Sequence, residues 1–351
     1  MINRARQICS FLIGTALCAV LLWGCADTGR TLPSATGSIY EMLVVIDKAE
    51  WEAQSGAKIK EVMAADMPCL PQMESYFSLT QCSPQLFDNF LMPTRNILYV
   101  DVNPERYTSA KIRYARNQWS KPQAVCFVQS PNWDEFNELF NKQAENIRNW
   151  FVREELTRQG KFYQGYQTTE TRKAAEKRFG IDIRIPEDYL LVRDTADLVW
   201  CVNDGGSLRR DLIIWSYPYL SQDQLCLDSL LSKRNEILGK NIVGSIQGTY
   251  MGTEYKHFPP IFTPISINDN WCAEVRGLWK MQGGEAMGGP FVQHTRIDEL
   301  SHRLITAEVF IFAPGQKKRN PLRQAEAILY TIKLPQEINQ LKEVKVSQPT
   351  Q

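Results

Sequence analysis

The longest periodic apolar pattern in the chain follows Ser130-Pro131 and predicts a helix that must pack against a sheet. Serine at a cap position and proline in the first turn are typical of a helix start. Large apolar residues then recur at every third or fourth position, namely Trp133, Phe136, Phe140, Ile147, Trp150 and Phe151. We expect the helix to end at Gly160. Such a stripe covers a sheet far more often than it lines a ligand groove.

Apolar runs of strand length lie on both sides of this helix. Those before it are 42–46, 95–102, 111–115 and 124–129, and those after it are 181–185, 189–193, 198–202, 212–217, 246–255, 271–281, 291–296 and 304–312. Further helices are expected over 48–66, 169–179, 222–238 and 321–329. We predict an α+β fold of two mixed α/β units, each a largely antiparallel sheet covered by helices.

The first 25 residues have the order of a secretory signal that ends in a lipobox. Arg4 and Arg6 precede an apolar run from residue 8 to residue 22, which is shorter than the roughly 20 residues that a membrane-spanning helix needs. Leu22-Trp23-Gly24-Cys25 closes the run. We expect residues 1–24 to be a signal peptide and Cys25 to carry a lipid that anchors the protein to a membrane. Ordinary signal cleavage with a free Cys25, or an uncleaved anchor, are the alternatives.

The rest of the chain is long enough for two domains. Residues 25–38 are rich in Thr, Ser, Gly and Pro and are expected to be a flexible tether. We predict an N-terminal α/β domain over 39–165 and a strand-rich C-terminal α+β domain over 166–335, followed by a loose polar tail over 336–351.

Charge and cysteine content exclude some function classes. The 40 Lys and Arg residues nearly balance the 39 Asp and Glu residues, so no basic surface for nucleic acid is expected. Six cysteines remain after Cys9, Cys18 and Cys25 are set aside, and in an exported protein they allow fifteen disulfide pairings. No C-x-x-C pair is present, and most of the six lie in strand-like sequence, where buried free cysteines are expected.

No catalytic motif stands out. The chain lacks H-E-x-x-H, G-x-S-x-G and a P-loop, and an S-x-x-K pattern at Ser55 has no K-T-G or S-D-N partner. A hairpin between His294 and His302 would bring them near Asp298 and Glu299, but lone histidines at strand ends are more often structural. We therefore predict no metal and no cofactor.

Two stretches offer candidate binding residues. The glycine-rich stretch 283–291 is expected to be either a hairpin turn or a flexible lip over a cleft, and it puts forward Gly288, Gly289 and Phe291, with His294 just beyond. The aromatic stretch 215–219 puts forward Trp215 and Tyr217, whose rings would either stack on sugars or belong to the core.

Several short motifs recur in an order that resembles one known family. They are Leu70-Pro71-Gln72 with Glu74 beyond, Arg95-Asn96-Ile97, Gly288-Gly289-Pro290-Phe291, and Ala313-Pro314-Gly315 followed by Lys317-Lys318-Arg319. Over about residues 38–334 they resemble the uncharacterised Bacteroidota lipoproteins that share domain of unknown function 4837. The resemblance implies an exported, lipid-anchored, mixed α/β protein, and it supplies no reaction and no catalytic residue.

These observations predict a cell-envelope lipoprotein that binds another envelope component, either protein or glycan, and that is not an enzyme. Surface display in such bacteria is favoured by acidic residues after the lipidated cysteine, whereas residues 26–30 hold one acid and one base. We therefore expect an outer-membrane anchor that faces the periplasm. The alternative function is an envelope hydrolase for peptidoglycan or polysaccharide, since glycoside hydrolysis needs only two facing carboxylates.

Overall fold

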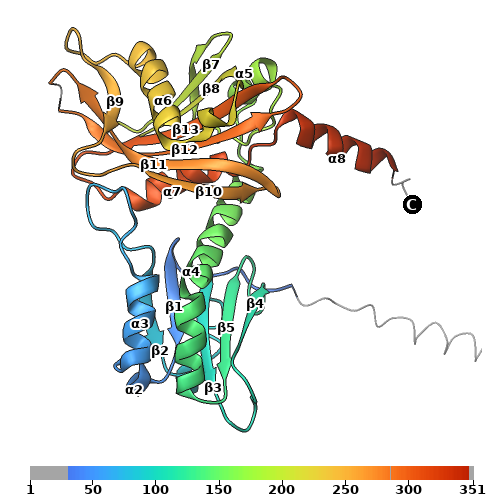
Figure 1. Ribbon diagram of the computed structural model, residues 1–351. Helices are drawn as coiled ribbons and strands as arrows, with labels where there is room; N and C mark the ends of the chain where they lie inside the picture. The colour runs from blue at the N-terminus through green and yellow to red at the C-terminus, as the bar shows by residue number, and fades with distance from the viewer. Residues whose placement is uncertain (1–30, 285, 348–351) are drawn as a thin grey trace, which may run out of the picture.

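The computed structural model describes residues 31–284 and 286–347, which form two stacked units joined by one long helix (Figure 1). The predicted signal peptide and Cys25 lie outside the described residues. The predicted class, α+β in two units, is confirmed. In the described part of the chain, no helix combines the length and the apolar character needed to cross a membrane.

The first unit is a five-stranded sheet in the order β2-β1-β3-β5-β4. Its strands are β1 (Glu41–Val45), β2 (Ser78–Cys82), β3 (Asn96–Val102), β4 (Lys111–Arg116) and β5 (Ala124–Ser130). All neighbouring strands are parallel except β4 and β5, so the prediction of a largely antiparallel sheet is wrong for this unit. The central strands are continuous apolar runs because both faces of the sheet are covered, as is usual for parallel sheets.

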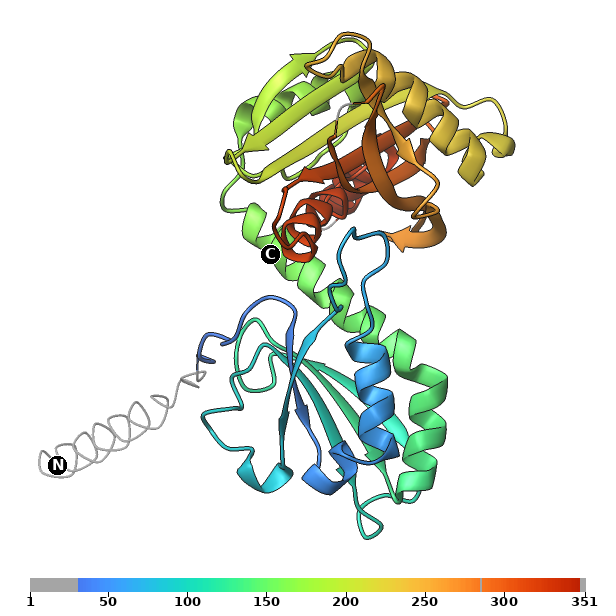
Figure 2. The same cartoon turned by 90° about the vertical axis from the view of Figure 1, so that its left-hand side faces the viewer.

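Helices cover one face of this first sheet. They are α3 (Gln54–Met63) and the first half of α4 (Trp133–Tyr163), which lie side by side in Figure 2, while α2 (Lys48–Trp51) and the 3-10 turn η1 (Pro84–Leu86) lie in the connections. The predicted stripe of α4 is buried at Phe136, Phe140, Ile147 and Phe151. Asn132 caps the helix, because its side chain accepts a hydrogen bond from the Glu135 amide.

The second unit is an eight-stranded antiparallel sheet in the order β10-β11-β12-β13-β8-β7-β6, with β9 also paired to β11. Its strands are β6 (Leu190–Asp194), β7 (Leu198–Asp204), β8 (Arg209–Pro218), β9 (Tyr250–Glu254), β10 (Ile261–Ile267), β11 (Asn270–Gln282), β12 (Gly288–Asp298) and β13 (Arg303–Phe312). The antiparallel prediction is confirmed here.

Three helices pack on this second sheet. One face is covered by α5 (Thr169–Phe179) and α7 (Arg319–Leu329), and the other by α6 (Leu227–Asn241), which follows the 3-10 turn η2 (Gln222–Leu225). Neighbouring residues of one strand therefore belong to different cores, as Ile214 does on the α7 side and Ile213 on the α6 side.

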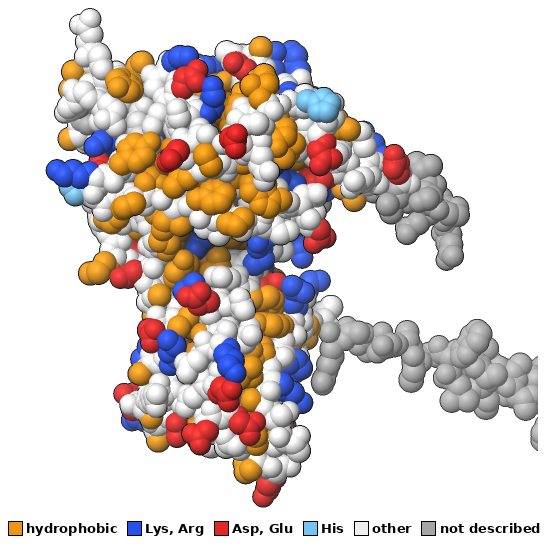
Figure 3. Space-filling model, viewed as in Figure 1, with side chains coloured by type: hydrophobic (Ala, Val, Ile, Leu, Met, Phe, Trp, Pro, Cys, Tyr) orange, Lys and Arg blue, Asp and Glu red, His pale blue; other side chains and the backbone are white. Residues whose placement is uncertain are grey.

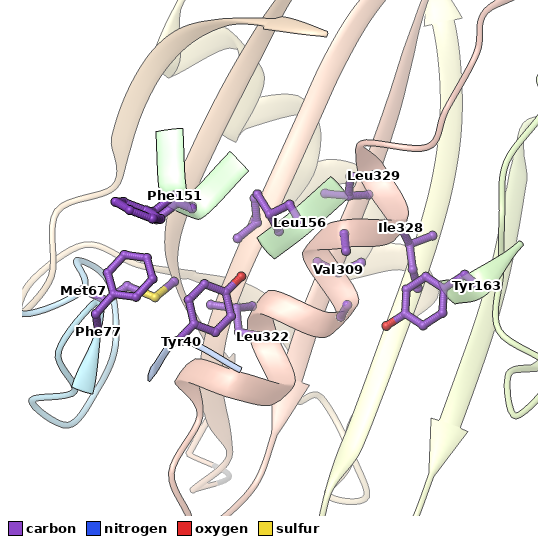
Figure 4. Packing of buried hydrophobic residues seen from close by; sticks show 14 of the residues in the cluster. Tyr40, Met67, Phe77, Phe151, Leu156, Tyr163, Val309, Leu322, Ile328 and Leu329 are labelled. Atoms are coloured by element: carbon purple, nitrogen blue, oxygen red, sulfur yellow. The ribbon is translucent and has the colours of Figure 1, made fainter. Parts of the chain in front are cut away.

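The core of the α7 side runs without a break from one unit into the other. Figure 4 shows Tyr40 and Phe77 of the first unit near Leu322 of α7, with Leu156 of α4 close by. The sequence predicts that α4 ends at Gly160, but the helix continues to Tyr163. A Cβ at Gly160 would lie 3.0 Å from Cγ2 of Thr331, so glycine there allows α4 to continue closely past the end of α7.

Other boundaries differ from the prediction because of long-range contacts. Residues 181–185 form no strand, although Ile181, Ile183 and Ile185 are buried. The described part of the expected tail is helical: it forms α8 (Pro335–Ser347), in which Glu337 forms an ion pair with Arg296 of β12. Part of the expected tether is docked, because Ser34 and Thr36 form bridges to the first unit.

All six cysteines in the described residues are free. Five are buried and only Cys226 is exposed, so the expectation of buried, apolar cysteines holds for most of them. Burial raises the pKa of the Cys201 thiol to about 12, which keeps it protonated and unreactive.

Candidate functional site

A cavity of about 430 Å³ lies where the two units meet, and we call it the inter-unit cavity. Its walls come from α4, α7, β10, β11 and the loop after α3, through Pro68, Tyr76, Glu145, Arg148, Asn149, Val152, Arg153, Leu156, Ile261, Thr263, Ile265, Glu274, Arg276, Arg323 and Tyr330. The volume is within the range of small-molecule sites, roughly 300 to 1,000 Å³. Figure 3 shows Lys and Arg side chains along the waist between the units.

Regular secondary structure explains why these residues converge. Glu145, Arg148, Val152 and Leu156 recur at three to four residues and therefore share one face of α4, beside the apolar stripe that packs on the first sheet. Glu274 and Arg276 are two positions apart in β11 and point to the same side of the second sheet.

Glu274, Arg276 and Arg323 of the cavity lining form, with the buried Glu326 behind them, a network of four buried charges, which we call the charge network. Arg276 donates to Glu274 through Nε at 2.8 Å and Nη2 at 3.0 Å, and through Nη1 to Glu326 at 3.3 Å. Arg323 donates to both oxygens of Glu326, at 3.0 and 2.9 Å. Two arginines thus face two carboxylates, so the charge network is neutral overall.

Glu274 is held in its ionised form. Burial acts to raise the pKa of this carboxyl, but Arg276 and His294 outweigh it and hold the pKa below the ordinary value. His294 Nε2 lies 3.1 Å from Oε2 of Glu274, and the Tyr330 hydroxyl donates to the same oxygen at 3.4 Å. Glu274 therefore accepts hydrogen bonds and is a poor proton donor.

Two further arginines line the inter-unit cavity without a carboxylate partner. Arg148 lies 4.5 Å from the ring centre of Tyr76, and Arg153 lies 4.7 Å from that of Tyr330. Arg153 also donates to the Ser266 carbonyl at 3.1 Å. Among the described residues neither arginine forms an ion pair, and the buried Nε of Arg148 has no hydrogen-bond partner. Stacking on an aromatic ring orients a guanidinium and leaves its in-plane donors open to an anion.

Of the sequence candidates that lie in the described residues, His294 alone reaches the inter-unit cavity, through Glu274. Trp215 and Phe291 are buried in the core under α6, and Trp215 is only 1% exposed, so neither ring presents a face to a sugar. Tyr217 is half-buried at the same core, with Lys233 5.5 Å from its ring centre.

The glycine-rich stretch forms a hairpin connection between β11 and β12. Gly288 and Gly289 are already part of β12 and pair with Lys280 and Trp279. A Cβ on Gly289 would lie 1.9 Å from the Ile311 carbonyl oxygen, so this position needs glycine for close packing of strands.

Two motifs that carried the family resemblance meet at the start of α7. Glu74 accepts hydrogen bonds from the Lys318 amide at 2.6 Å and the Arg319 amide at 3.1 Å, and Arg319 donates to the Ser75 carbonyl at 2.7 Å. The carboxylate thus caps α7 from the other unit. Lys318 is buried, although a short run of basic residues is usually solvated.

The inter-unit cavity was missed at the sequence level, although one signal pointed to it. Glu274 and Arg276 are charged residues inside an otherwise apolar strand, where a charge must be paired to be buried. The packing of α4 near β11 depends on contacts between residues that are more than 100 positions apart in the chain. No group of three or more His, Cys, Asp or Glu side chains in the described residues is arranged to hold a metal, and His294 and His302 are not joined in one.

Comparison with known proteins agrees with part of the resemblance. Residues 167–331 match domain of unknown function 4837 (DUF4837), while residues 35–164 match a separate family model, domain of unknown function 8532 (DUF8532). The match to DUF4837 is therefore shorter than the resemblance suggested. The division into domains near residue 165 stays a prediction. No curated protein matches the chain.

Two solved structures show remote likeness. The Ran-binding protein Mog1p of Saccharomyces cerevisiae is 7% identical, with a TM-score of 0.29 over 44% of this chain and 90% of that protein. The human StarD13 lipid transfer and protein localization domain is 9% identical, with a TM-score of 0.21 over 41% of this chain and 88% of that domain. At these scores the likenesses do not bear on function.

Proposed function

We propose that this chain, whose residues 167–331 match DUF4837, is a lipid-anchored envelope protein that binds an anionic group of another envelope component in the inter-unit cavity. The observation that carries the proposal is the pair Arg148 and Arg153, which line the cavity without a carboxylate partner among the described residues. The component is a protein or a glycan that bears a carboxylate or phosphate.

The physical basis is preorganisation. Arg148 and Arg153 are already oriented by the rings of Tyr76 and Tyr330, so less side-chain entropy is lost when an anion binds. The charge network behind them is neutral and hydrogen-bonded, so it does not compete for them. A bidentate contact between a guanidinium and a carboxylate or phosphate adds both affinity and direction.

The alternative, an envelope hydrolase, is supported less well. A glycosidase needs one protonated carboxyl beside one ionised carboxylate. The two acids that line the inter-unit cavity are Glu145 and Glu274, and Arg276 with His294 keeps the pKa of Glu274 low. Glu145, the other acid of the lining, is exposed to solvent. Binding without turnover is therefore the better reading.

Calorimetry with small anions tests the binding site. We expect inorganic phosphate or glutarate to bind, and glutaramide, which has the same shape without charge, not to bind. The double variant Arg148→Gln, Arg153→Gln should weaken binding at least tenfold. A matched control is Arg113→Gln, because Arg113 also stacks on an aromatic ring, 3.9 Å from the centre of Phe127, but in the first unit. Equal binding by both variants, or no binding by the unaltered protein, would contradict the proposal.

The lipid anchor is part of the same proposal and has its own support. The support is a basic start, a short apolar run and the small residue Gly24 directly before Cys25. We propose that residues 1–24 are removed, that Cys25 is acylated, and that the protein faces the periplasm from the outer membrane.

Labelling with fatty acid tests the anchor. In the producing cells, Cys25→Ser should lose the label and leave the membrane fraction, whereas Cys226→Ser, at an exposed cysteine, should keep both. Protease added to intact cells should leave the protein uncut if it faces the periplasm. Full labelling of Cys25→Ser would refute the anchor, and cutting in intact cells would refute the orientation.

A further inference from the structure

A second pocket, of about 350 Å³, lies at the end of α4 and is lined by second-unit elements; we call it the tyrosine pocket. Its lining includes Phe162, Tyr163, Tyr166, Tyr189, Arg210 and Gln324. Helix α4 supplies Phe162 and Tyr163, and the segment just after it supplies Tyr166. The turn before β6 supplies Tyr189, and β8 and α7 supply Arg210 and Gln324. Figure 4 shows Tyr163 beside Ile328 of α7.

Two buried polar atoms in the tyrosine pocket have no partner among the described residues. The Tyr189 side chain is 3% exposed and its hydroxyl makes no hydrogen bond. Nε of Arg210 is also buried and unpartnered, although Nη1 donates to Asn203 at 2.9 Å and Nη2 lies 3.5 Å from Oε1 of Gln324. Buried donors without an acceptor are rare and costly in folded proteins. An acceptor on a ligand would satisfy both.

The rim of the tyrosine pocket is aromatic and exposed. Phe162 and Tyr166 are 58% and 53% exposed, and their ring centres lie 4.9 Å apart at an interplanar angle of 30°. The two rings therefore form a paired aromatic surface at the mouth of the pocket. Glu187 and Asp188 also line the pocket and provide carboxylate acceptors.

We propose that the tyrosine pocket binds one pyranose ring of a neutral saccharide. The apolar CH face of the ring packs on Phe162 and Tyr166. Oxygens of the ring accept hydrogen bonds from Tyr189 and Arg210, and hydroxyl groups donate to the carboxylates of Glu187 and Asp188. One arginine against two carboxylates gives no positive field for an acidic ligand, which is why the saccharide is neutral.

This inference goes beyond the anion site, because it concerns other residues and another ligand class. Burial raises the pKa of Tyr189 well above its ordinary value, so its hydroxyl stays protonated and able to donate. Of the two alternatives left open for Trp215, stacking on sugars or a place in the core, the core holds, and the proposed sugar contact lies at other, exposed rings.

Saturation-transfer NMR on the full-length protein tests the inference with four probes: glucose, N-acetylglucosamine, and the β-1,4-linked dimer of each. We expect at least one probe to bind. Tyr189→Phe removes a single oxygen and should weaken binding about threefold to tenfold, as expected for one hydrogen bond. Phe162→Ala should weaken it at least as much. The matched control is Phe90→Ala, at a phenylalanine that is 85% exposed in the first unit.

The outcomes separate this inference from the anion site. If none of the four probes binds the unaltered protein, or if Phe162→Ala and Tyr189→Phe bind as well as Phe90→Ala does, the inference is refuted. Phe162 is exposed, so that variant is expected to fold even if Tyr189→Phe does not. The Arg148→Gln, Arg153→Gln variant should keep saccharide binding, and Phe162→Ala should keep phosphate binding.

Discussion

Replacing Glu326 with Gln should destabilise the protein strongly, because it leaves two buried arginines with one carboxylate. Glu326 is fully buried and accepts hydrogen bonds from Arg276 and Arg323, which are themselves buried. The substitution keeps the shape of the side chain but changes the net charge of the charge network from zero to +1. Removing one partner from a buried ion pair typically costs about 3 to 5 kcal/mol, since the remaining charge stays out of water.

Urea unfolding at pH 7 measures the effect. With a slope of ~3 kcal/mol per M, the midpoint should fall by about 1 to 1.7 M. Tryptophan fluorescence and circular dichroism are followed together, because two units need not unfold in one step. The control is Glu138→Gln, which breaks an exposed pair with Lys142 and should cost about 0.5 kcal/mol or less. A midpoint for Glu326→Gln equal to that of the control would refute the reasoning, and would mean that the arginines find water or another partner.

Three further substitutions probe other features of the fold. Burial acts to raise the pKa of Glu155, but its arginine neighbours hold the pKa below 4.5. The contribution of Glu155 to folding stability is therefore complete above about pH 4.5 and is lost as the pH falls through the lower folded pKa. The difference in urea midpoint between the unaltered protein and Glu155→Gln should shrink from pH 7 to pH 3, and a constant difference would contradict this. Glu74→Gln removes the negative charge that caps α7 and should cost about 1 kcal/mol in thermal unfolding, and an unchanged melting temperature would show that the cap is dispensable. Gly289→Ala places a Cβ 1.9 Å from a carbonyl oxygen and should cost several kcal/mol or abolish soluble expression, whereas Gly165→Ala, with its nearest atom at 3.8 Å, should be close to neutral.

Local patterns in the sequence were enough to predict most strands and helices. The apolar stripe of α4 and the runs that became β3, β5 and β13 depend only on neighbouring residues, and the structure has them within a few positions. The direction of each strand and the strand with which it pairs depend on the whole chain. The runs of the first sheet are continuous rather than alternating, which is the usual sign of parallel strands, yet apolar runs of this length also fit buried antiparallel strands.

Boundaries set by tertiary contact could not be predicted. Gly160 has the composition of a helix end, but its missing side chain lets α4 pass α7 closely. Residues 336–347 are polar and would be loose by themselves, and their helix is tied to β12 by the ion pair of Glu337 with Arg296. In both cases the deciding partner lies well over 30 positions away.

The chemistry of the candidate site could not be predicted from local sequence either. Glycine and aromatic clusters drew attention to residues 215–219 and 283–291, but those rings and glycines serve the packing of β8 and β12. The charged residues that line the inter-unit cavity are of types common on any protein surface, and only the groups that face them in the fold make them a candidate site. Arg148 and Arg153 are unremarkable on α4 until β11 places a paired Glu274 and Arg276 opposite.

The two matched regions meet near residue 165, yet one hydrophobic core crosses that boundary. The core on the α7 side includes Tyr40 and Phe77 from the first unit and Leu322 from the second. Glu74 caps α7 from the first unit, so the helix that carries Arg323 is fixed by the same loop that supplies Tyr76 to the inter-unit cavity. An anion bound by Arg148 of α4, opposite β11, would therefore enter a site whose walls are already held in place by these contacts. Its binding should not require the two units to close on it.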